Sequence, residues 1–375
     1  MAQSEKMAGV DPRDIQSAEL VLGCEDLAAS LQFYVEQLGF RLDAIFPADL
    51  PRVAVISGHG VRIRLDRDAD TAPGTLRLLF RDARPGDGGV DNVGERVSPD
   101  GTRIHFTRAD SSIEMAPLAP TVIVQRADAR SWRTGRAGMQ YRDLIPDRLG
   151  GRYIASHIRI PNGGPVPDYV HHHGVQFQMI YCHRGWVRVV YEDQGPAFKM
   201  QAGDCVLQPP HIRHRVLEAS DGMEVIEICC PAEHQTLVDH EMALPTRSLR
   251  PDREFEDQHF VFHQSVNSTW KAGPYDGFES TDTGIRTATR GLASARGLRP
   301  THGARACGVE QDAEYLFNFV LQGSVTLDCP SDGSWSLAPG DAFVMPAGRS
   351  FSFAAVSTDL ELLQVSLNQT SAPRF

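Results

Sequence analysis

Short apolar, strand-like runs dominate the chain from about residue 136 onward, and Gly and Pro residues separate them. Examples are Tyr153–Ile160, Gln176–Cys182, Val187–Tyr191, Cys205–Gln208 and Val225–Ile228. In a strand, successive side chains point to opposite faces, so each run offers one face to a core. Many short strands between turn residues are typical of an all-β barrel or sandwich. The pattern therefore predicts a mostly β fold for this part of the chain.

Residues 16 to about 82 follow a different pattern, in which one helix stands among strands. A short apolar strand, Glu19–Gly23, comes first, and Gly39 is typical of the end of the helix that follows. The helix is indicated by apolar residues at helical spacing, namely Leu27, Leu31, Val35 and Leu38. Further strand-like runs are Phe40–Phe46, Val53–Ser57, Val61–Leu65 and Thr75–Phe80. We interpret this region as a β-α-β-β-β module.

The helical part of this module carries a recognisable string, Asp26–Tyr34, followed by Leu38-Gly39-Phe40. The string resembles the vicinal oxygen chelate family, which includes the glyoxalases. The resemblance implies a metal-binding His on the first strand and a site closed by two such modules. Here Glu19 stands at the histidine position and only one module is present. We therefore favour a scaffold or dimerisation module over a metal enzyme, and we expect a homodimer formed by self-pairing.

Two connecting segments follow this module. Residues 83–99 are rich in Asp, Gly, Arg and Pro and are interpreted as a loop or linker. Residues 100–135 contain two short strand-like runs, Thr102–Thr107 and Thr121–Gln125, which lead to the next domain.

The strand pattern of the later part of the chain occurs twice. Gly185 corresponds to Gly323, which lies 138 residues further on. The run Gly203–Pro209 corresponds to Gly340–Pro346, which lies 137 residues further on. Two coincidences at nearly the same offset indicate a duplicated domain.

The first copy carries a dense set of metal-binding side chains, spaced H-x-H-x4-Q-x6-G and then G-x5-P-x4-H. His171 and His173 lie two residues apart on an extended segment, so both point to one face and His172 points to the other. Gln178 follows on the next strand, and His214 begins a strand after a Pro-stiffened corner. Three imidazoles and one amide oxygen are thus offered to a single interior point, which predicts a metal site.

These spacings resemble the two signature motifs of the cupin superfamily, and the duplication resembles a bicupin. The resemblance implies His171, His173 and His214 as metal ligands, with Gln178 where the family pattern has Glu. His211 replaces a Gly that is usual in the second motif. The implied domains are a glyoxalase-like module at 1–115, a metal-binding cupin at 116–240 and a second cupin at 241–375.

The second copy has lost every ligand. Aligned through Gly323, the four ligand positions become Val309, Gln311, Leu316 and Phe351. We therefore expect the C-terminal copy to bind no metal and to act as a structural partner, or to take an apolar ligand.

Net charge and cysteine content exclude some classes of function. The formal net charge of −11 argues against nucleic acid as a partner, since phosphate contacts need a basic surface. No apolar run approaches the length of a membrane span, and residues 1–14 carry no apolar core of a signal peptide. Seven cysteines, most of them within apolar runs, are interpreted as reduced, buried thiols of a cytoplasmic protein.

Imidazole-rich sites with an oxygen donor suit Fe(II), Mn(II), Ni(II) or Zn(II). Neutral ligands leave the metal charge uncompensated, so the site favours a small anionic substrate that chelates the ion. The cupin resemblance implies oxygenase activity, as in gentisate and quercetin dioxygenases, with Fe(II) holding substrate and O2. We expect Gln176, Arg188 and Glu227 to assist catalysis, with Arg159 and Arg213 as further candidates for holding a carboxylate.

Three functional interpretations stay open at this point. The first is an Fe(II)-dependent dioxygenase that acts on a small aromatic or enolisable anion. The second is a non-redox isomerase or lyase that uses the metal as a Lewis acid. The third is a protein that binds a metal or a ligand without catalysis. Metal content and dependence on oxygen distinguish the three.

Overall fold

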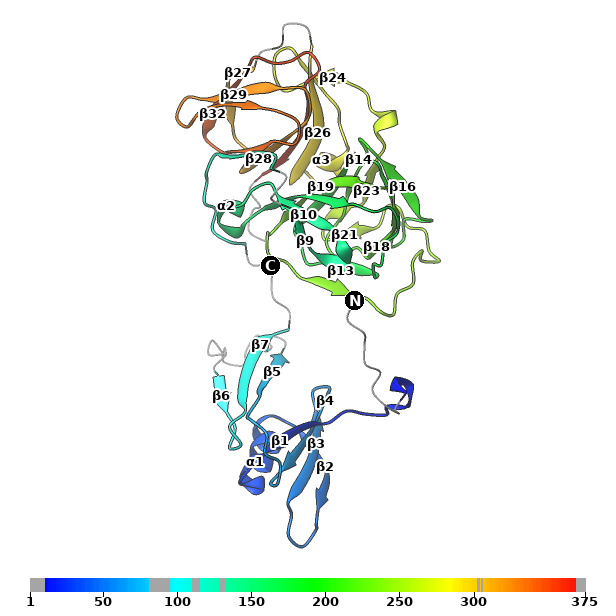
Figure 1. The fold of residues 1–375 in the computed structure, drawn as a ribbon, viewed down its shortest axis with the longest axis vertical. Coiled ribbons are helices and arrows are strands. Elements are labelled where there is room, and N and C mark those ends of the chain that lie inside the picture. Colours follow the sequence, from blue (N-terminus) through cyan, green and yellow to red (C-terminus); the bar gives the residue numbers. More distant parts are fainter. Residues whose placement is uncertain are drawn as a thin grey trace. The chain divides into compact units, whose positions relative to one another are not determined.

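The computed structural model describes residues 11–80, 95–109, 115–128, 132–301, 304 and 306–368. The chain forms two compact units, Met1–Ser112 and Ile113–Phe375. Strands dominate both units and helices are short, so the protein is mostly β, as the hydrophobic pattern predicts (Figure 1). Within the described ranges, no helix has the length and apolar character needed to cross a membrane. Most of the predicted linker 83–99 lies outside the described residues.

The first unit contains the predicted β-α-β-β-β order. Its elements are η1 (Pro12–Asp14), β1 (Leu20–Gly23), α1 (Leu27–Gln32), η2 (Phe33–Gln37), β2 (Arg41–Phe46), β3 (Val53–Gly58), β4 (Val61–Asp66), β5 (Thr75–Phe80), β6 (Glu95–Val97) and β7 (Arg103–Arg108). Strands β1-β4-β3-β2 form one sheet, and β5, β7 and β6 form a second. The helix begins where the side chain of Asp26 accepts a hydrogen bond from the backbone N–H of Ala29 (3.0 Å).

The core of the first unit lies between its sheet and its helix. Tyr34 from the helical segment and Ile56 and Ile63 from the sheet are fully buried. Glu19, at the position where the resembled family has a metal-binding His, forms an ion pair with Arg62 (2.7 Å). This contact gives Glu19 a structural partner.

The second unit begins with two facing sheets, which we call the N-terminal sheet pair. One has the order β23-β17-β14-β19-β11-β10-β9, and the other has the order β16-β15-β18-β13-β20 with β12 paired to β18. The strands are β9 (Arg133–Thr134), β10 (Gln140–Asp143), β11 (Ile154–Ile160), β12 (Gly164–Pro165), β13 (His171–His173), β14 (Phe177–Arg184), β15 (Trp186–Tyr191), β16 (Phe198–Gln201), β17 (Cys205–Leu207), β18 (His214–Ala219), β19 (Met223–Cys230), β20 (Thr236–Val238) and β23 (Val261–His263).

Two more sheets make up the C-terminal sheet pair, with orders β24-β25-β26-β33-β28-β31-β8 and β27-β32-β29-β30. The strands are β8 (Ile123–Gln125), β24 (Lys271–Ala272), β25 (Phe278–Ser280), β26 (Ala293–Pro300), β27 (Ala306–Gln311), β28 (Tyr315–Gln322), β29 (Val325–Cys329), β30 (Gly333–Leu337), β31 (Ala342–Pro346), β32 (Arg349–Ala354) and β33 (Glu361–Leu367). Short elements outside both pairs are η4 (Arg136–Gly138), α2 (Arg148–Gly151), β21 (Glu254–Phe255), β22 (Gln258–His259), η5 (Ser265–Asn267) and α3 (Ile285–Ala288).

The two sheet pairs exchange edge strands. Strand β8 precedes the N-terminal pair in sequence but pairs with β31, and β23 follows that pair but joins it beside β17. At each exchanged strand, the side chain of one aspartate accepts a backbone hydrogen bond from the neighbouring segment. Asp204 accepts the backbone N–H of Ser265, and Asp341 accepts the backbone N–H of Ala127. Each seven-stranded sheet thus contains one strand from the other side of residue 240. The domain boundary at this residue stays a prediction.

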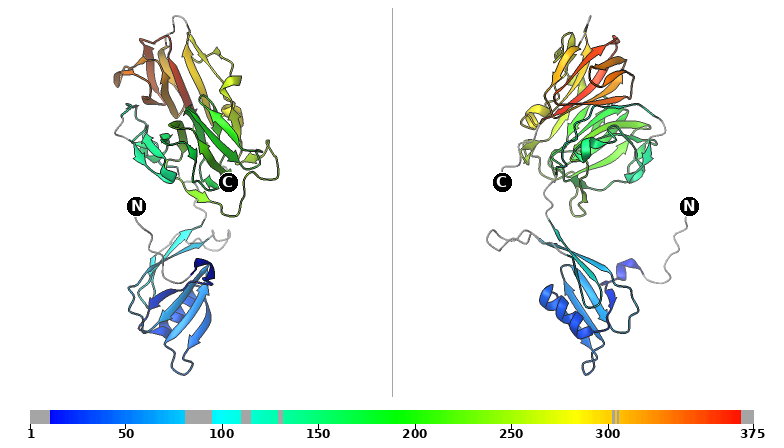
Figure 2. Two further views of the ribbon diagram at one scale, coloured as in Figure 1. Left: turned by 45° about the vertical axis from the view of Figure 1, so that its right-hand side comes forward. Right: turned by 90° about the vertical axis from the view of Figure 1, so that its left-hand side faces the viewer.

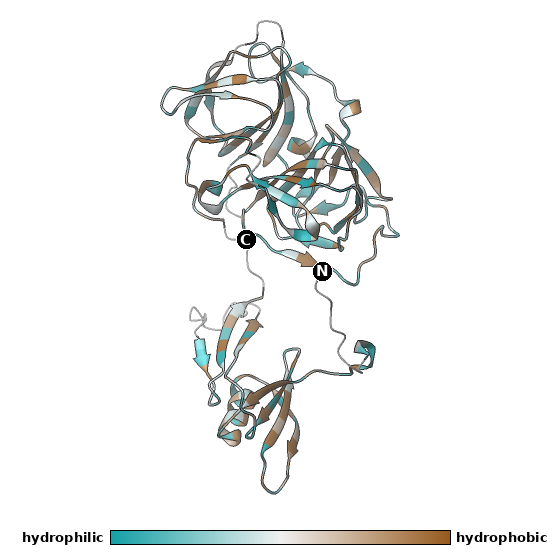
Figure 3. Ribbon diagram, viewed as in Figure 1, coloured by the Kyte–Doolittle hydropathy of each residue, from teal (hydrophilic) through white to brown (hydrophobic). Residues whose placement is uncertain are grey.

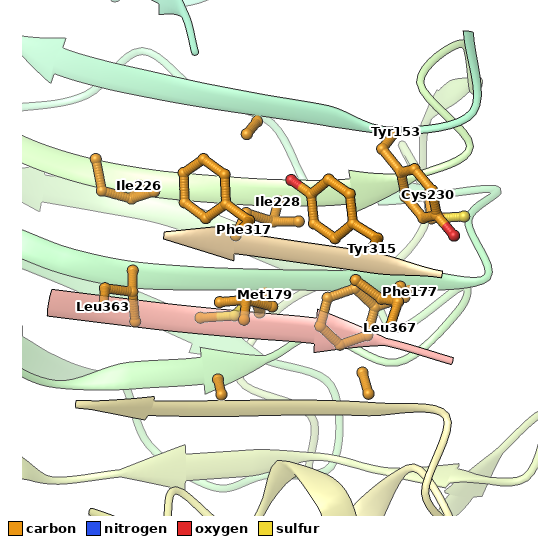
Figure 4. Close-up of a cluster of buried hydrophobic side chains, with 14 of the residues drawn as sticks. Tyr153, Phe177, Met179, Ile226, Ile228, Cys230, Tyr315, Phe317, Leu363 and Leu367 are labelled. Carbon is orange, nitrogen blue, oxygen red and sulfur yellow. The ribbon is translucent and has the colours of Figure 1, made fainter. Parts of the chain in front are cut away.

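The largest hydrophobic core lies where the two seven-stranded sheets face each other (Figure 4). Phe177, Met179 and Ile228 of the first sheet meet Tyr315 and Phe317 of the second. Figure 2 shows the green strands of one pair and the yellow-to-red strands of the other as neighbouring bodies. Hydrophobic and hydrophilic residues succeed one another along many strands (Figure 3), which gives each sheet pair a further apolar interior.

Backbone geometry repeats at the sequence positions that indicate the duplication. Gly185 and Gly323 have φ values of 70° and 71°, and Gly203 and Gly340 have φ values of 93° and 90°. Residues with side chains rarely adopt this left-handed backbone, so the same turns require glycine in both copies. The six cysteines whose side chains are described are free and buried.

Candidate metal centre

Three imidazoles converge inside the N-terminal sheet pair. His171 and His173 come from β13, and His214 begins the neighbouring strand β18, directly opposite His171 in the antiparallel register. One ring nitrogen of each lies within 4.8 Å of the others, and all three side chains are buried. The structure thus brings together the three histidines singled out by their spacing.

The second nitrogen of each ring is held by the surrounding protein. His171 Nδ1 donates to the carbonyl of Tyr169 (2.8 Å) and His214 Nδ1 donates to the carbonyl of Ile212 (3.0 Å). His173 Nδ1 lies 3.0 Å from the hydroxyl of Thr236. A carbonyl only accepts, so the proton sits on Nδ1 in His171 and His214 and the lone pair sits on Nε2. Hydrogen bonds of this kind orient the imidazoles that bind metals.

Burial keeps these imidazoles neutral. Desolvation, followed by repulsion from neighbouring imidazoles, lowers the pKa of His173 to about 2. The pKa of His171 and of His214 moves in the same direction, with desolvation again the largest cause. A neutral imidazole offers a lone pair to a cation, so these three groups are ready to bind a metal at neutral pH.

The histidines stand on the wall of a cavity of about 410 Å³ inside the N-terminal sheet pair. Most of this wall is apolar, with Ile158, Ile180, Val189, Met200 and Val225 among the lining residues. Polar side chains, among them Arg136, Gln208 and Glu227, stand between these apolar ones, as in pockets that bind small molecules. The volume also lies in the range of such pockets.

The residue expected to be a fourth ligand lies beside this cavity. Gln178 is buried, and its amide donates to the carboxylate of Glu227 (2.8 Å). Glu227 itself lines the cavity, whereas Gln178 is not among the lining residues. Glu227, which the sequence analysis expects to assist catalysis, thus places a carboxylate at this cavity. A ligand role for Gln178 stays a prediction.

The other expected catalytic residues lie away from the cavity wall. Arg188 points outward from β15 and forms an ion pair with Glu218 (3.1 Å). The backbone carbonyl of Gln176 accepts a hydrogen bond from the side-chain amide of Gln258 (2.6 Å). Neither Arg188 nor Gln176 lines the cavity. The alternation of β15 explains the position of Arg188, because Val187 and Val189 take the inner face.

Arg136 lines the cavity and was not singled out by the sequence motifs. Its Nη2 atom lies 3.2 Å from His171 Nε2, and its Nη1 atom is bound by the buried carboxylate of Asp168. Arg136 precedes the motif by 35 residues, in the short η4 segment. No spacing in the sequence linked it to the histidines, since only the folded sheet brings them together.

Gln208 is a second such residue. It lines the cavity, is completely buried, and neither its amide oxygen nor its amide nitrogen has a hydrogen-bond partner among the described residues. Buried polar groups are normally paired, so an unpaired amide on a cavity wall points to a bound polar group.

Four other histidines lie away from the wall of this cavity. His172 points away from the cavity, and its Nδ1 atom lies 3.3 Å from Nδ1 of His211, as the alternation of β13 predicts. His183 lies within β14, and together with His157 and Glu224 it forms a second group of metal-type donors. The sequence spacing does not indicate this group, because its members come from three strands.

The C-terminal sheet pair places other side chains at the matching positions. Val309 of β27 lies opposite Phe351 of β32, in the register that His171 and His214 have in the other pair. Leu316 and Phe351 are buried in the apolar interior. Three of the replacements expected from the repeat alignment, Val309, Leu316 and Phe351, are therefore apolar and pack in this interior.

The N-terminal site fits a divalent metal ion. Three neutral imidazoles with their second nitrogens anchored are the donor set that Zn(II), Fe(II) or Ni(II) prefers. The nitrogen spacing within 4.8 Å suits donors around one ion. His171, His173 and His214 would hold the ion at the wall of the cavity.

Comparisons with known proteins give one family match and several similar solved structures. Residues 156–229 match the family described as a cupin domain. A salicylate 1,2-dioxygenase from Pseudaminobacter salicylatoxidans is 14% identical with a TM-score of 0.50, over 68% of this chain and 86% of its own. An oxalate decarboxylase from Lactobacillus farciminis is 12% identical with a TM-score of 0.49, over 68% and 88%. A 7S globulin from Momordica charantia is 14% identical with a TM-score of 0.45, over 64% and 83%.

No curated protein matches this chain. At these identities the likeness to solved structures is one of fold. Residues 156–229, which include all three converging histidines, are therefore similar to the cupin domain, and the chain shares its fold with a salicylate dioxygenase.

Proposed function

We propose that the protein is a metal-dependent oxidoreductase, an Fe(II) dioxygenase that acts on a small anionic substrate. The observation that carries this proposal is the group of three neutral, buried imidazoles on the wall of a cavity of about 410 Å³. The substrate is an aromatic or enolisable acid that chelates the ion. The likeness of fold to a salicylate dioxygenase agrees with this class.

Arg136 supplies the positive charge that an acid needs. Its guanidinium is tethered through Nη1 to Asp168, while Nη2 points at the lone pair of His171. A metal ion needs the same lone pair and repels a cation, so Arg136 must turn its Nη2 donors elsewhere when the ion is bound. The cavity is where those donors can meet a substrate carboxylate, in a charge-assisted hydrogen bond.

The remaining polar groups orient the substrate. The unpaired amide of Gln208 can donate to one oxygen and accept from one hydroxyl, which selects a substrate with both groups. Glu227 is positioned to accept a proton from a substrate hydroxyl, and its bond to Gln178 fixes its direction. The apolar wall covers the ring of an aromatic acid and excludes water.

When bound, Fe(II) would hold substrate and O2 together at its open positions. Gentle purification followed by metal analysis tests the first half of the proposal, with iron expected at about one ion per chain. Oxygen uptake with a panel of hydroxybenzoates and 2-oxo acids tests the second half. Turnover that persists without oxygen would contradict the proposal.

One observation favours a second function, a non-redox isomerase or lyase. Glu227 places a carboxylate in the cavity, and a base beside a Lewis-acid metal is sufficient for proton transfer on an enolisable acid. This function predicts zinc or manganese in the purified protein and turnover of 2-hydroxy or 2-oxo acids under anaerobic conditions. A metal-loaded protein inactive on both panels would indicate a binding protein instead.

The architecture itself extends this proposal. We propose that the two sheet pairs are two cupin barrels, of which the first alone binds metal, and that the first unit is a glyoxalase-like module that pairs with a second copy. The matching glycines and aspartates support the duplication, and the order of β1, α1, β2, β3 and β4 supports the module. Light scattering of the full chain tests the dimer, and a monomeric mass would contradict it.

A further inference from the structure

A second cluster of charged groups lies where the two sheet pairs meet. It surrounds a cavity of about 330 Å³, which we call the junction cavity, lined by Trp132, Arg142, His157, Arg159 and Glu224 together with Gly340 of the other sheet pair. His157, His183 and Glu224 bring their donor atoms within 4.8 Å of one another. None of these residues lines the cavity of the candidate metal centre.

The duplication provides a natural control for this cluster. A cavity of about 490 Å³, the twin cavity, lies at the corresponding place beside Trp270 and Arg299. Arg159 stacks over Trp132 with 4.2 Å to the ring centroid, and Arg299 stacks over Trp270 with 4.1 Å. Both cavities therefore have the same aromatic and cationic frame.

The two cavities differ in the other side chains that line them. Arg142 lies opposite His157 in the register of β10 and β11, where the twin cavity has Thr281 bonded to Gly297. His183 corresponds in the repeat to Leu321, and both residues line both cavities. The twin cavity keeps Arg299 and also has Arg296 and Glu361 on its wall, but Thr281 and Gly297 take the places of the buried Arg142 and His157. The fold therefore does not require Arg142, and a costly buried charge that packing does not require points to a ligand.

Arg142 is the most informative member of the cluster. It is only 3% exposed, and its Nε atom has no hydrogen-bond partner within the described part of the chain. Its Nη2 atom donates to His157 Nδ1 (2.9 Å) and to the carbonyl of Gly340 (2.8 Å). Among the described residues, no carboxylate forms an ion pair with Arg142 or with Arg159. The cavity wall carries three arginines, Arg142, Arg159 and Arg184, and two carboxylates, Asp128 and Glu224, so positive charge is in excess there. Arg142 and Arg159 stack on the same ring of Trp132.

The same contacts argue against a cation. A guanidinium only donates, so His157 Nδ1 must accept from Arg142, and the proton of His157 lies on Nε2. Nε2 donates this proton to Glu224 (2.8 Å), which leaves no lone pair for a metal. Arg184 also contacts Glu224 (3.4 Å) and adds a third positive charge beside the donors.

We propose that the junction cavity binds a small oxyanion, a carboxylate or phosphate group, between Arg142 and Arg159. Guanidinium groups hold both oxyanions through pairs of charge-assisted hydrogen bonds. The cavity opens between both sheet pairs, so a bound anion connects them through Arg142 and Gly340. The site is separate from the candidate metal centre, and its occupation does not depend on the proposed dioxygenase activity.

Calorimetric titration of the full chain with inorganic phosphate and with malonate, against chloride at matched ionic strength, tests the site. We expect saturable binding that Arg159→Gln weakens by about 10-fold or more, since a charge-assisted hydrogen bond is lost. Arg299→Gln removes the same cation from the twin cavity and is the matched control, with binding unchanged. Tighter binding of phosphate or of malonate tells which oxyanion the cavity prefers.

A second variant guards against misfolding of the first. Arg184→Gln changes a side chain that is 70% exposed, so it tests the cavity charge without disturbing the core. We expect a smaller weakening of anion binding from this change. Several results would overturn the proposal: no binding beyond chloride, equal losses in Arg159→Gln and Arg299→Gln, or an extra zinc ion that Glu224→Gln removes.

Discussion

The interiors of the two sheet pairs differ although their backbones match. The N-terminal pair has His171 opposite His214, and the C-terminal pair has Val309 opposite Phe351. The comparison extends to the neighbouring strands, where Gln208 accompanies Gln178 in one pair and Met345 lies opposite Leu316 in the other. One interior keeps a cavity with polar groups on its wall, while the other is filled with apolar side chains.

This difference separates residues that maintain the frame from residues that act in a site. Gly203 and Gly340 turn the chain in the same way, and Asp204 and Asp341 anchor the exchanged strands in the same way. Such residues persist in both copies because the fold needs them. The histidines occur in one copy alone, although the fold forms equally well with Val and Phe. Packing therefore does not require the histidines of the N-terminal pair.

The largest expected effect is the loss of metal in His173→Ala. One of three donors disappears, so we expect metal affinity to fall by roughly 100-fold or more. His172→Ala is the matched control, because His172 lies on the same strand and points to the other face. Metal content of both purified variants is the measurement. If His173→Ala keeps one metal ion per chain, the proposed set of ligands is wrong.

The stability of the C-terminal pair provides the next test. Phe351 is 1% exposed, so Phe351→Ala should lower the free energy of unfolding by about 3–5 kcal/mol. His214→Ala, at the matching position of the metal-free protein, should cost less, because it borders an existing cavity. Urea unfolding followed by fluorescence compares the two variants. Equal losses would mean that both interiors are packed alike.

Arg136→Gln should act on substrate capture. Loss of one charge-assisted hydrogen bond to a carboxylate should raise KM by about 10- to 100-fold, with a smaller change in kcat. Arg188→Gln serves as the control, since Arg188 pairs with Glu218 outside the cavity. Steady-state kinetics with an acid and with its neutral amide checks the role. If both substrates suffer equally, Arg136 does not recognise the carboxylate.

The smallest expected effect concerns Gln178→Glu, which places a second carboxyl group against Glu227. Repulsion raises the folded-state pKa of the pair, so the folded protein binds a proton more readily than the unfolded chain. The variant should therefore match wild type at low pH and lose about 1–3 kcal/mol of stability as pH rises above about 4.3. Urea midpoints at pH 5 and pH 8 measure this dependence. A deficit of the same size at both values would rule out charge repulsion as the cause.

The sequence by itself predicted the strand pattern, the duplication and the three converging histidines. These features are local or periodic. Alternation fixes which side of β13 His171 and His173 share, and turns that need a positive φ require glycine at the same place in each copy. The loss of the ligands in the second copy is equally visible, because Phe351 replaces His214 at a fixed offset.

Only the tertiary structure decided which other side chains reach the cavity. Arg136 and Gln208 were missed, and Arg188 was placed at the site although it faces outward. The tertiary structure also formed the junction cavity, where Arg142 of β10 donates a hydrogen bond to the carbonyl of Gly340, 198 residues further along the chain. Contacts between distant strands depend on the order of strands within a sheet and on how two sheets pack face to face. A sequence pattern of period two specifies a face of a strand but not its neighbour across the core.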